Sequence, residues 1–145
     1  MRASPQGYNM SQRAIMQRED RKRSRLLAIN LDVQDQSLIS NILQTESEPY
    51  ELLFRDSLGP ANEFRLEGGP FDVIVINFSS STKADFDLLA AIQREDPLAR
   101  VIFLSRLADE SLWIESIQRG AYDFLPKPLD QQEFRRILNN AIQKP

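Results

Sequence analysis

The sequence contains no cysteine and no histidine. The chain therefore has no disulfides, no thiolate chemistry, and neither the usual general base nor the commonest metal ligand. Any chemistry must rest on carboxylates, lysine, hydroxyls or the backbone. No apolar segment approaches the ~20 residues of a membrane-spanning helix, and the N-terminus lacks the apolar core of a signal peptide. We therefore expect a cytoplasmic protein without a membrane segment.

The charge is distributed unevenly along the 145 residues, a length typical of one domain with its own core. Residues 1–25 carry seven basic and two acidic side chains, whereas the remainder carries eleven basic and nineteen acidic ones. A basic arm can contact nucleic acid or an anionic membrane, but terminal charge runs are more often solvated leaders, which we favour here. We predict a basic polar arm, flexible or helical, over residues 1–24 and a folded domain over 25–145. The acidic body argues against direct nucleic-acid binding by that domain.

The central feature is the apolar run Phe71-Asp-Val-Ile-Val-Ile-Asn77, which is typical of a strand buried on both faces. Four other short apolar segments predict strands, and four segments with helical spacing predict helices, of which the last follows an N-cap at Asp130. Asp32 and Asp35 are alternative N-caps for the first of these helices, and a weaker helix is predicted around Phe64. The predicted strands are 25–30, 50–54, 71–77, 101–105 and 122–125; the predicted helices are 37–45, 62–67, 84–96, 110–119 and 131–142.

This alternation predicts an α/β fold, a doubly wound parallel sheet with helices on both faces. The carboxyl ends of parallel strands meet at one edge of such a sheet, where sites lie. The residues expected there are two amides, a carboxylate, a hydroxyl and an ammonium group: Asn30 and Asp32 after the first strand, Asn77 after the third, Ser105 after the fourth and Lys127 after the fifth. The sequence therefore predicts a small polar pocket.

At these positions the sequence resembles the receiver domain of bacterial response regulators, over residues 26–143. The resemblance rests on the central strand, on Val101-Ile-Phe-Leu-Ser105 and above all on Gly120-Ala-Tyr-Asp-Phe-Leu-Pro-Lys-Pro128. It implies a five-stranded flavodoxin-like sheet of order 2-1-3-4-5. In the family, the central strand ends in an aspartate that accepts a phosphoryl group, and acidic residues after the first strand hold Mg²⁺. A hydroxyl and a lysine hold the phosphoryl oxygens, and an aromatic residue reports the switch.

Carried onto this chain, the resemblance assigns the hydroxyl to Ser105, the aromatic residue to Phe124, and the lysine to Lys127 followed by Pro128. The acceptor position holds Asn77 instead of aspartate. The positions of the acidic pair hold Asn30 and Leu31, and Asp32 keeps the third acidic place. The sequence therefore matches the family pattern at the ends of the fourth and fifth predicted strands and departs from it at the ends of the first and third.

An amide nitrogen is not a nucleophile toward phosphorus at neutral pH, so Asn77 would form no acyl phosphate. Leu31 offers no side-chain oxygen, and Asp32 alone would bind Mg²⁺ weakly. We therefore predict no metal, no cofactor and no enzymatic activity. Lys127 would have lost its carboxylate partners, which suggests a hydrogen bond to the side-chain oxygen of Asn77 or Asn30.

Two alternative functions have less support in the sequence. The hydroxyls of residues 79–82 could accept phosphate, but such a loop more often supplies a helix N-cap, here Ser81 or Thr82. A working enzyme of flavodoxin-like fold would lack histidine, cysteine and a phosphate-cradling glycine loop after the first strand.

Trp113 is the only tryptophan, and it is either a core residue or a half-exposed anchor for a partner, which we favour. In receivers the face made by the fourth helix, fifth strand and fifth helix is the common docking and dimer face. The resemblance places on or near it Arg106, Glu110, Trp113, Arg119 and Arg135.

The leading prediction is a phosphorylation-independent receiver-like module for protein–protein interaction or dimerisation. We expect it to be the N-terminal regulatory domain of a bacterial transcriptional response regulator, because the chain stops just after the last predicted helix. Its partner would be another protein, an output domain, or a second copy bound through the docking face. The alternative is a regulatory module that binds a small molecule in the altered pocket.

Overall fold

The computed structural model describes residues 9, 12, 23–46, 50–56, 64–78, 82–107 and 109–142. Nearly all of the predicted N-terminal arm lies outside these residues, as does the predicted N-cap Ser81. In chain order the elements are β1 (Ser24–Ile29), α2 (Val33–Gln44), β2 (Tyr50–Arg55), β3 (Val73–Asn77), α3 (Thr82–Glu95), β4 (Arg100–Ser105), α4 (Glu110–Gln118), β5 (Asp123–Pro126) and α5 (Gln131–Ile142). Within these ranges no helix is long and apolar enough to cross a membrane.

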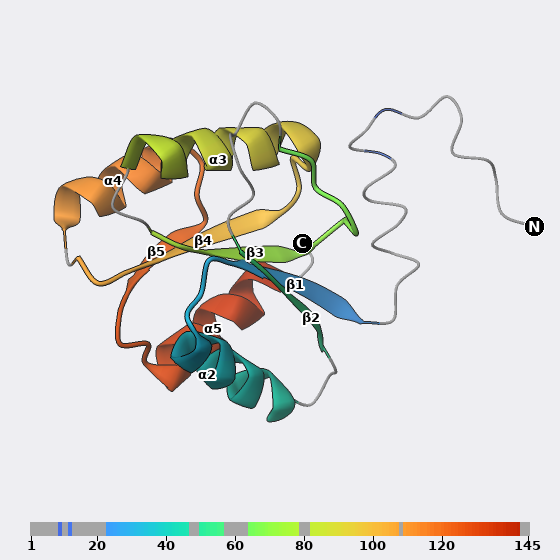
Figure 1. Cartoon of the computed structure of the whole chain (residues 1–145), viewed down its shortest axis with the longest axis vertical. Coiled ribbons are helices and arrows are strands. Elements are labelled where there is room, and N and C mark those ends of the chain that lie inside the picture. The colour runs from blue at the N-terminus through green and yellow to red at the C-terminus, as the bar shows by residue number, and fades with distance from the viewer. Residues whose placement is uncertain are drawn as a thin grey trace, which may run out of the picture.

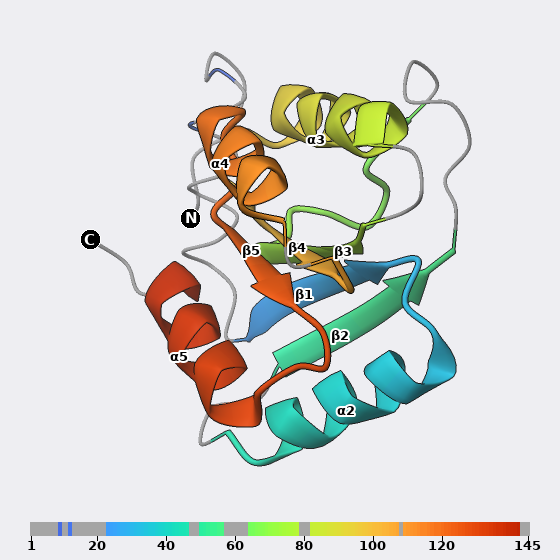
Figure 2. The ribbon, with the colours of Figure 1, turned by 90° about the vertical axis from the view of Figure 1, so that its left-hand side faces the viewer.

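The five strands form one parallel sheet of order β2-β1-β3-β4-β5, which confirms the predicted fold class and strand order. Helices α2 and α5 cover one face of the sheet, and α3 and α4 cover the other (Figures 1 and 2). The order reverses next to β1, so the carboxyl ends of β1 and β3 form the crevice in which sites lie in such folds.

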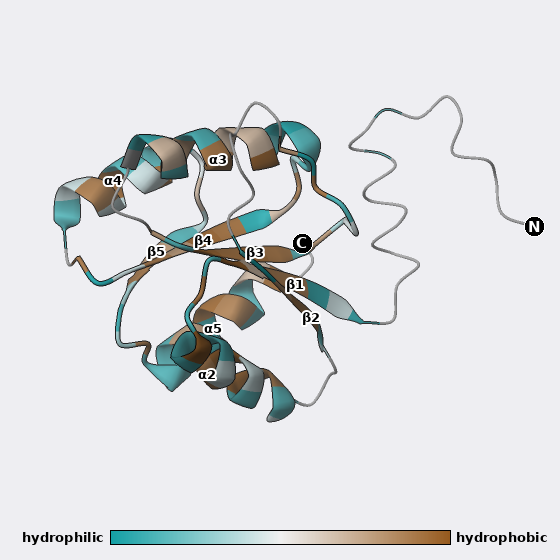
Figure 3. Ribbon diagram, viewed as in Figure 1, coloured by the Kyte–Doolittle hydropathy of each residue, from teal (hydrophilic) through white to brown (hydrophobic). Residues whose placement is uncertain are grey.

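Strand β3 is the centre of the core because its two faces contribute to different apolar clusters. Val73 and Val75 pack with residues of α2 and α5, whereas Ile74 and Ile76 pack with residues of α3. All four are fully buried. Figure 3 shows the apolar sheet between helices whose outward faces are polar. Burial on both faces explains why this strand is almost uninterrupted apolar sequence.

The helix ends agree with the predicted caps. The Asp32 side chain accepts a 2.8 Å hydrogen bond from the backbone N–H of Asp35, and Asp130 accepts one of 3.0 Å from Glu133. Helix α2 nevertheless begins at Val33, four residues before the predicted start. The helical spacing of apolar residues was a poor guide there, since the first turn is polar apart from Val33, which is 75% exposed.

The predicted helix over 62–67 is wrong for its described part. Phe64 is buried, as expected of an anchor, but residues 64–66 are irregular and a turn follows at residues 67–68. Arginine side chains bind the carbonyls of this segment from the sheet: Arg55 donates to the Glu67 carbonyl and Arg25 to the Gly68 carbonyl. These side-chain bonds satisfy backbone acceptors without a helix.

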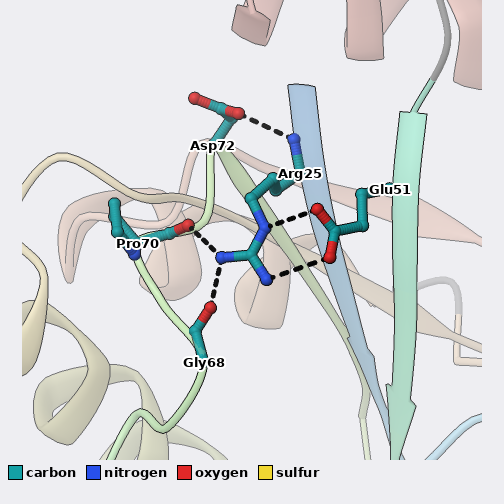
Figure 4. Close-up of polar contacts among 5 residues, drawn as sticks. All are labelled: Arg25, Glu51, Gly68, Pro70 and Asp72. Atoms are coloured by element: carbon teal, nitrogen blue, oxygen red, sulfur yellow. Dashed lines mark hydrogen bonds and ion pairs between the residues drawn. The ribbon is translucent and has the colours of Figure 1, made fainter. Parts of the chain in front are cut away.

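Arg25 joins three parts of the chain at the N-terminal end of the sheet (Figure 4). Its guanidinium forms a bidentate contact with Glu51 of β2, at 3.1 and 3.4 Å, and donates to the carbonyls of Gly68 and Pro70. It also stacks on the Phe71 ring, with 4.7 Å to the centroid. The Arg25 side chain is only 13% exposed, whereas that of Glu51 is 49% exposed, so water reaches the carboxylate more readily than the guanidinium.

We predict that Arg25→Met lowers the free energy of unfolding by about 2–3 kcal/mol, because it removes several charge-assisted hydrogen bonds made by a nearly buried guanidinium. Urea unfolding followed by circular dichroism measures the loss. Arg100→Met is the control: Arg100 also stacks on an aromatic ring, that of Tyr122, but is exposed, and its loss should cost well under about 1 kcal/mol. Equal costs would show that the Arg25 contacts add nothing beyond stacking.

Candidate functional site

The carboxyl ends of the strands enclose a pocket of about 410 Å³. Its lining residues come from the ends of β3, β4 and β5 and from the start of α2. They are Asp32, Asn77, Phe78, Ser105, Arg106, Leu107 and Lys127. The pocket predicted from the strand ends is therefore present, and Asn77, Ser105, Asp32 and Lys127 all line it.

Backbone hydrogen bonds fix how the three strand ends lie relative to one another. The N–H of Phe78 donates to the Leu104 carbonyl at 2.7 Å, and the N–H of Lys127 donates to the Ser105 carbonyl at 2.8 Å. The Ser105 hydroxyl oxygen accepts the N–H of Leu107 at 3.0 Å. Asn77, Ser105 and Lys127 are thus held at the carboxyl ends of adjacent parallel strands, and the Lys127–Pro128 peptide bond is cis.

Lys127 pairs with Asp35, a residue of the first turn of α2. The Nζ–Oδ2 distance is 2.6 Å, and the two side chains are only 7% and 15% exposed. The predicted hydrogen bond from Lys127 to Asn77 or Asn30 is therefore wrong. A carboxylate within reach is a stronger partner for an ammonium group than an amide oxygen, especially away from water.

Asp32 contributes to the pocket wall and also caps α2. The backbone N–H of Asp35, helped by the charges of Lys127 and Arg106, lowers the pKa of Asp32 below its usual value of 3.8. Its second oxygen lies 3.6 Å from the Arg106 guanidinium, in a pair that is largely exposed. Asp32 is therefore ionised at neutral pH, with one oxygen engaged in the helix cap.

Asn30 and Leu31 do not line the pocket, contrary to the prediction that they form part of it. Leu31 is 5% exposed and packs in the core beneath α2 and α5. Asn30 has a left-handed backbone, with φ of 61°, and its N–H donates to the Arg55 carbonyl at 2.8 Å. The apolar side chain of Leu31 is therefore part of the core, and Asn30, in its left-handed turn, is not among the residues that line the pocket.

The donors present fit Mg²⁺ poorly, because this cation takes several oxygen ligands at close range. Asp32 is partly engaged in the helix cap, Asp35 is paired with Lys127, and Leu31 has no donor. Among the described residues there is no group of three or more acidic side chains arranged to hold a metal ion.

Phe124 lies inside the structure, 6% exposed, in a cluster of aromatic rings behind the pocket. Its ring meets that of Phe78 edge to face, with centroids 5.5 Å apart. Phe78 makes similar contacts with Phe86 and Phe103, at 5.6 and 5.0 Å. The residue directly after Asn77 therefore connects the pocket to the aromatic residue of β5.

Sequence reasoning missed four residues of this site: Asp35 as a partner of Lys127, and Phe78, Arg106 and Leu107 as lining. The three lining residues could have been found, because each lies within two positions of a strand end. Asp35 required the correct start of α2, which places it in the first turn of this helix.

The structure separates the five predicted interface residues. Glu110 and Trp113 lie on the exposed side of α4, where Trp113 is 45% exposed. Arg106 instead faces Asp32 at the pocket. Arg119 stacks on Phe86 of α3, 4.5 Å from its centroid, and Arg135 reaches Glu46 at the end of α2.

Both arginines thus have partners within the domain, and Arg119 stays exposed and also pairs with Glu115 of α4 at 2.8 Å. The assignment of these two arginines to a docking face stays a prediction. The exposed apolar surface of α4, which we call the α4 face, consists of Trp113, Ile114 and Ile117, with exposed fractions of 45%, 40% and 38%.

The strand order and the lysine-bearing pocket at the strand ends define a doubly wound signalling-type α/β domain. A family model for the response regulator receiver domain matches residues 32–139, and the chain belongs to this family.

Three similar proteins illustrate the match. The chain is 31% identical over 80 residues to the DNA-binding transcriptional regulator NtrC of Rhizobium meliloti, covering 55% of this chain and 16% of NtrC. A response regulator from Thermotoga maritima superposes with a TM-score of 0.72 at 19% identity, covering 84% and 99% of the two chains. The pilus assembly protein CpaE from Caulobacter crescentus superposes with a TM-score of 0.67 at 18% identity, covering 81% and 92%. The two structural matches show the fold.

We predict that Asp35→Asn lowers the free energy of unfolding by about 3 kcal/mol, because it removes the carboxylate that pairs with the nearly buried ammonium of Lys127. Adding Lys127→Met to this variant should recover part of the loss, so the two changes cost less together than their sum. Urea unfolding of the original chain, of Asp35→Asn, of Lys127→Met and of the double variant measures the coupling energy between the two side chains.

The exposed pair Lys83–Asp87, with an Nζ–Oδ2 distance of 2.8 Å, is the matched control. Asp87→Asn should cost no more than about 0.5 kcal/mol, since both side chains are solvated. If Asp35→Asn is as mild as Asp87→Asn, the pair of Lys127 and Asp35 does not hold the pocket together.

Proposed function

We propose that this receiver domain works without phosphorylation, as a module that binds another protein. The observation that carries the proposal is the residue at the end of β3: Asn77 lines the pocket where the family has its phosphoryl-accepting aspartate. An amide cannot take the aspartate's role as nucleophile. The domain would therefore transmit signals as a binding partner and not as an enzyme.

The surroundings of Asn77 support the same proposal. Lys127, which in the family holds a phosphoryl oxygen, already has a carboxylate partner at 2.6 Å. An incoming phosphoryl group would have to compete with Asp35 for this ammonium. The metal that would neutralise the phosphoryl charge finds few free ligands, so we propose that the domain uses no cofactor.

We propose that the α4 face receives the partner. Trp113, Ile114 and Ile117 follow one another at helical spacing, and their partly exposed apolar surface is of the kind that anchors protein interfaces. The partner is another protein, an output region or a second copy of the chain; a homodimer through the α4–β5–α5 face stays a prediction. Binding of the partner would shift the populations of the domain's conformations, without any phosphoryl group.

The process that this domain would regulate is proposed from its relatives. NtrC is named a transcriptional regulator, and the matched segment is 16% of its length. We propose that this domain likewise serves a cytoplasmic bacterial regulator of transcription, and that its acidic body does not itself contact nucleic acid.

An NMR titration of the chain with Mg²⁺, beryllofluoride and a small phosphodonor tests the proposal. We expect no saturable shifts in the signals of Asn77, Ser105 or Lys127. A receiver that carries aspartate at the acceptor position, titrated in parallel, shows that the reagents are active. Saturable, site-specific shifts around Asn77 would refute phosphorylation independence.

The alternative function is binding of a small molecule in the pocket. It is favoured by the pocket's volume of about 410 Å³ and by its mixed lining, in which Phe78 and Leu107 stand beside charged groups. In that case a native mass spectrum of the purified chain should show a co-purified ligand. Asn77→Trp, which would fill the pocket, is the control, and the extra mass should be absent from its spectrum.

A further inference from the structure

Strand β2 forms one edge of the sheet and pairs only with β1 among the described strands. The Arg55 carbonyl accepts the N–H of Asn30 and thus points toward β1. Because successive residues of a strand direct their backbone groups to opposite sides, Leu53 and Glu51 also point toward β1. Leu52 and Phe54 therefore direct their N–H and C=O groups toward the edge of the sheet, away from β1.

An open groove of about 510 Å³ runs beside this edge, between β2 and α2. Its lining is mixed, with both apolar and polar side chains. The lining residues are Ser40, Leu43, Gln44, Glu46, Tyr50, Leu52 and Phe54. Phe54 is 36% exposed, so part of its ring is open to solvent at this edge.

The usual protections of an edge strand are weak in β2. Natural edges are commonly shielded by proline, a bulge or charges directed at the approaching chain. The six residues Tyr-Glu-Leu-Leu-Phe-Arg contain no proline. Their two charges, Glu51 and Arg55, lie on the face opposite the groove, and each has a partner within the domain: Glu51 binds Arg25, and Arg55 binds the Glu67 carbonyl.

We propose that β2 pairs antiparallel with β2 of a second copy, around a two-fold axis through Leu53. The sequence is self-complementary in this register: Glu51 lies opposite Arg55 of the second copy, and the same pair repeats across the axis. Such closely spaced cross-strand pairs of opposite charge stabilise a sheet. The interface is isologous, as a closed dimer requires.

The backbone supports the same register. Leu52 lies opposite Phe54 of the second copy, and both direct their hydrogen-bonding groups at the edge, so each such pair exchanges both N–H···O=C bonds. Moving the axis to Leu52 places Glu51 opposite Leu53, and moving it to Phe54 places Arg55 opposite Leu53. Of these three registers, only the one centred on Leu53 matches opposite charges.

The dimer joins two five-stranded sheets into one continuous sheet. It places Phe54 of each copy beside Leu52 in the groove of the other, which buries its exposed ring. The α4 face lies near the opposite edge of the sheet and stays accessible (Figure 2). This inference goes beyond the proposed function, because it holds whether or not the pocket accepts a phosphoryl group.

A charge exchange tests the interface. Glu51→Arg and Arg55→Glu each place like charges opposite one another twice, so each variant alone should raise the dimer dissociation constant by about tenfold or more. In a heterodimer of the two variants, position 51 of each chain lies opposite a position 55 of the opposite charge. A one-to-one mixture should therefore dimerise as well as the original chain. Sedimentation equilibrium of the 145-residue chains measures the constants of both variants and of the mixture.

A loss of folding in one variant cannot produce this recovery, so the mixture separates pairing from stability. A chain that remains monomeric at the concentrations of an NMR sample would overturn the proposal. So would a mixture that dimerises no better than either variant alone.

Cross-linking tests the register independently, because the chain has no cysteine of its own. Leu53→Cys places two thiols at a non-hydrogen-bonded antiparallel pair, with Cα atoms about 4.5 Å apart, within the range for a disulfide. We expect rapid formation of a disulfide-linked dimer under mild oxidation. Trp113→Cys is the control on the α4 face, and cross-linking there in place of position 53 would assign dimerisation to that face and refute the β2 interface.

Discussion

The pocket depends on the ion pair between Lys127 and Asp35. It connects the loop after β5 to the first turn of α2 and so spans the site from one side to the other. Its two charges are nearly buried, and each therefore needs the other. The more exposed pair of Arg106 and Asp32 lies beside it. Asp32, Arg106 and Lys127 line the pocket, and Asp35 pairs with Lys127 from the first turn of α2.

Much of this arrangement follows from the sequence. Apolar runs of β-branched residues predicted the buried strands, and the family motif brought Asn77, Ser105 and Lys127 to one pocket, where the structure has them. Asp35 was not predicted as a site residue because its role depends on where α2 begins, and a polar first turn carries no apolar periodicity. The directions of Arg119 and Arg135 depend on tertiary neighbours, Phe86 and Glu46, that no local pattern identifies.

The fold separates the surfaces that the proposed interactions would use. Because the sheet runs from β2 at one edge to β5 at the other, the groove beside β2 and the α4 face lie on opposite flanks. The pocket opens at a third position, the carboxyl ends of the strands. The aromatic rings of Phe78 and Phe124 connect this pocket to β5, which lies beside α4. The proposed sites for a second copy, a partner and a ligand therefore do not overlap.

The left-handed turn at Asn30 bears on which side chains this position tolerates. Asparagine and aspartate both tolerate such a backbone, so an exchange between them at this position needs no rebuilding of the turn. Leu31 is different, because its side chain is part of the core and a carboxylate there would be buried among apolar groups. An aspartate at position 30 would therefore fit the existing turn, whereas one at position 31 would place a carboxylate in the apolar core. The two positions differ in what they tolerate although they are neighbours in the sequence.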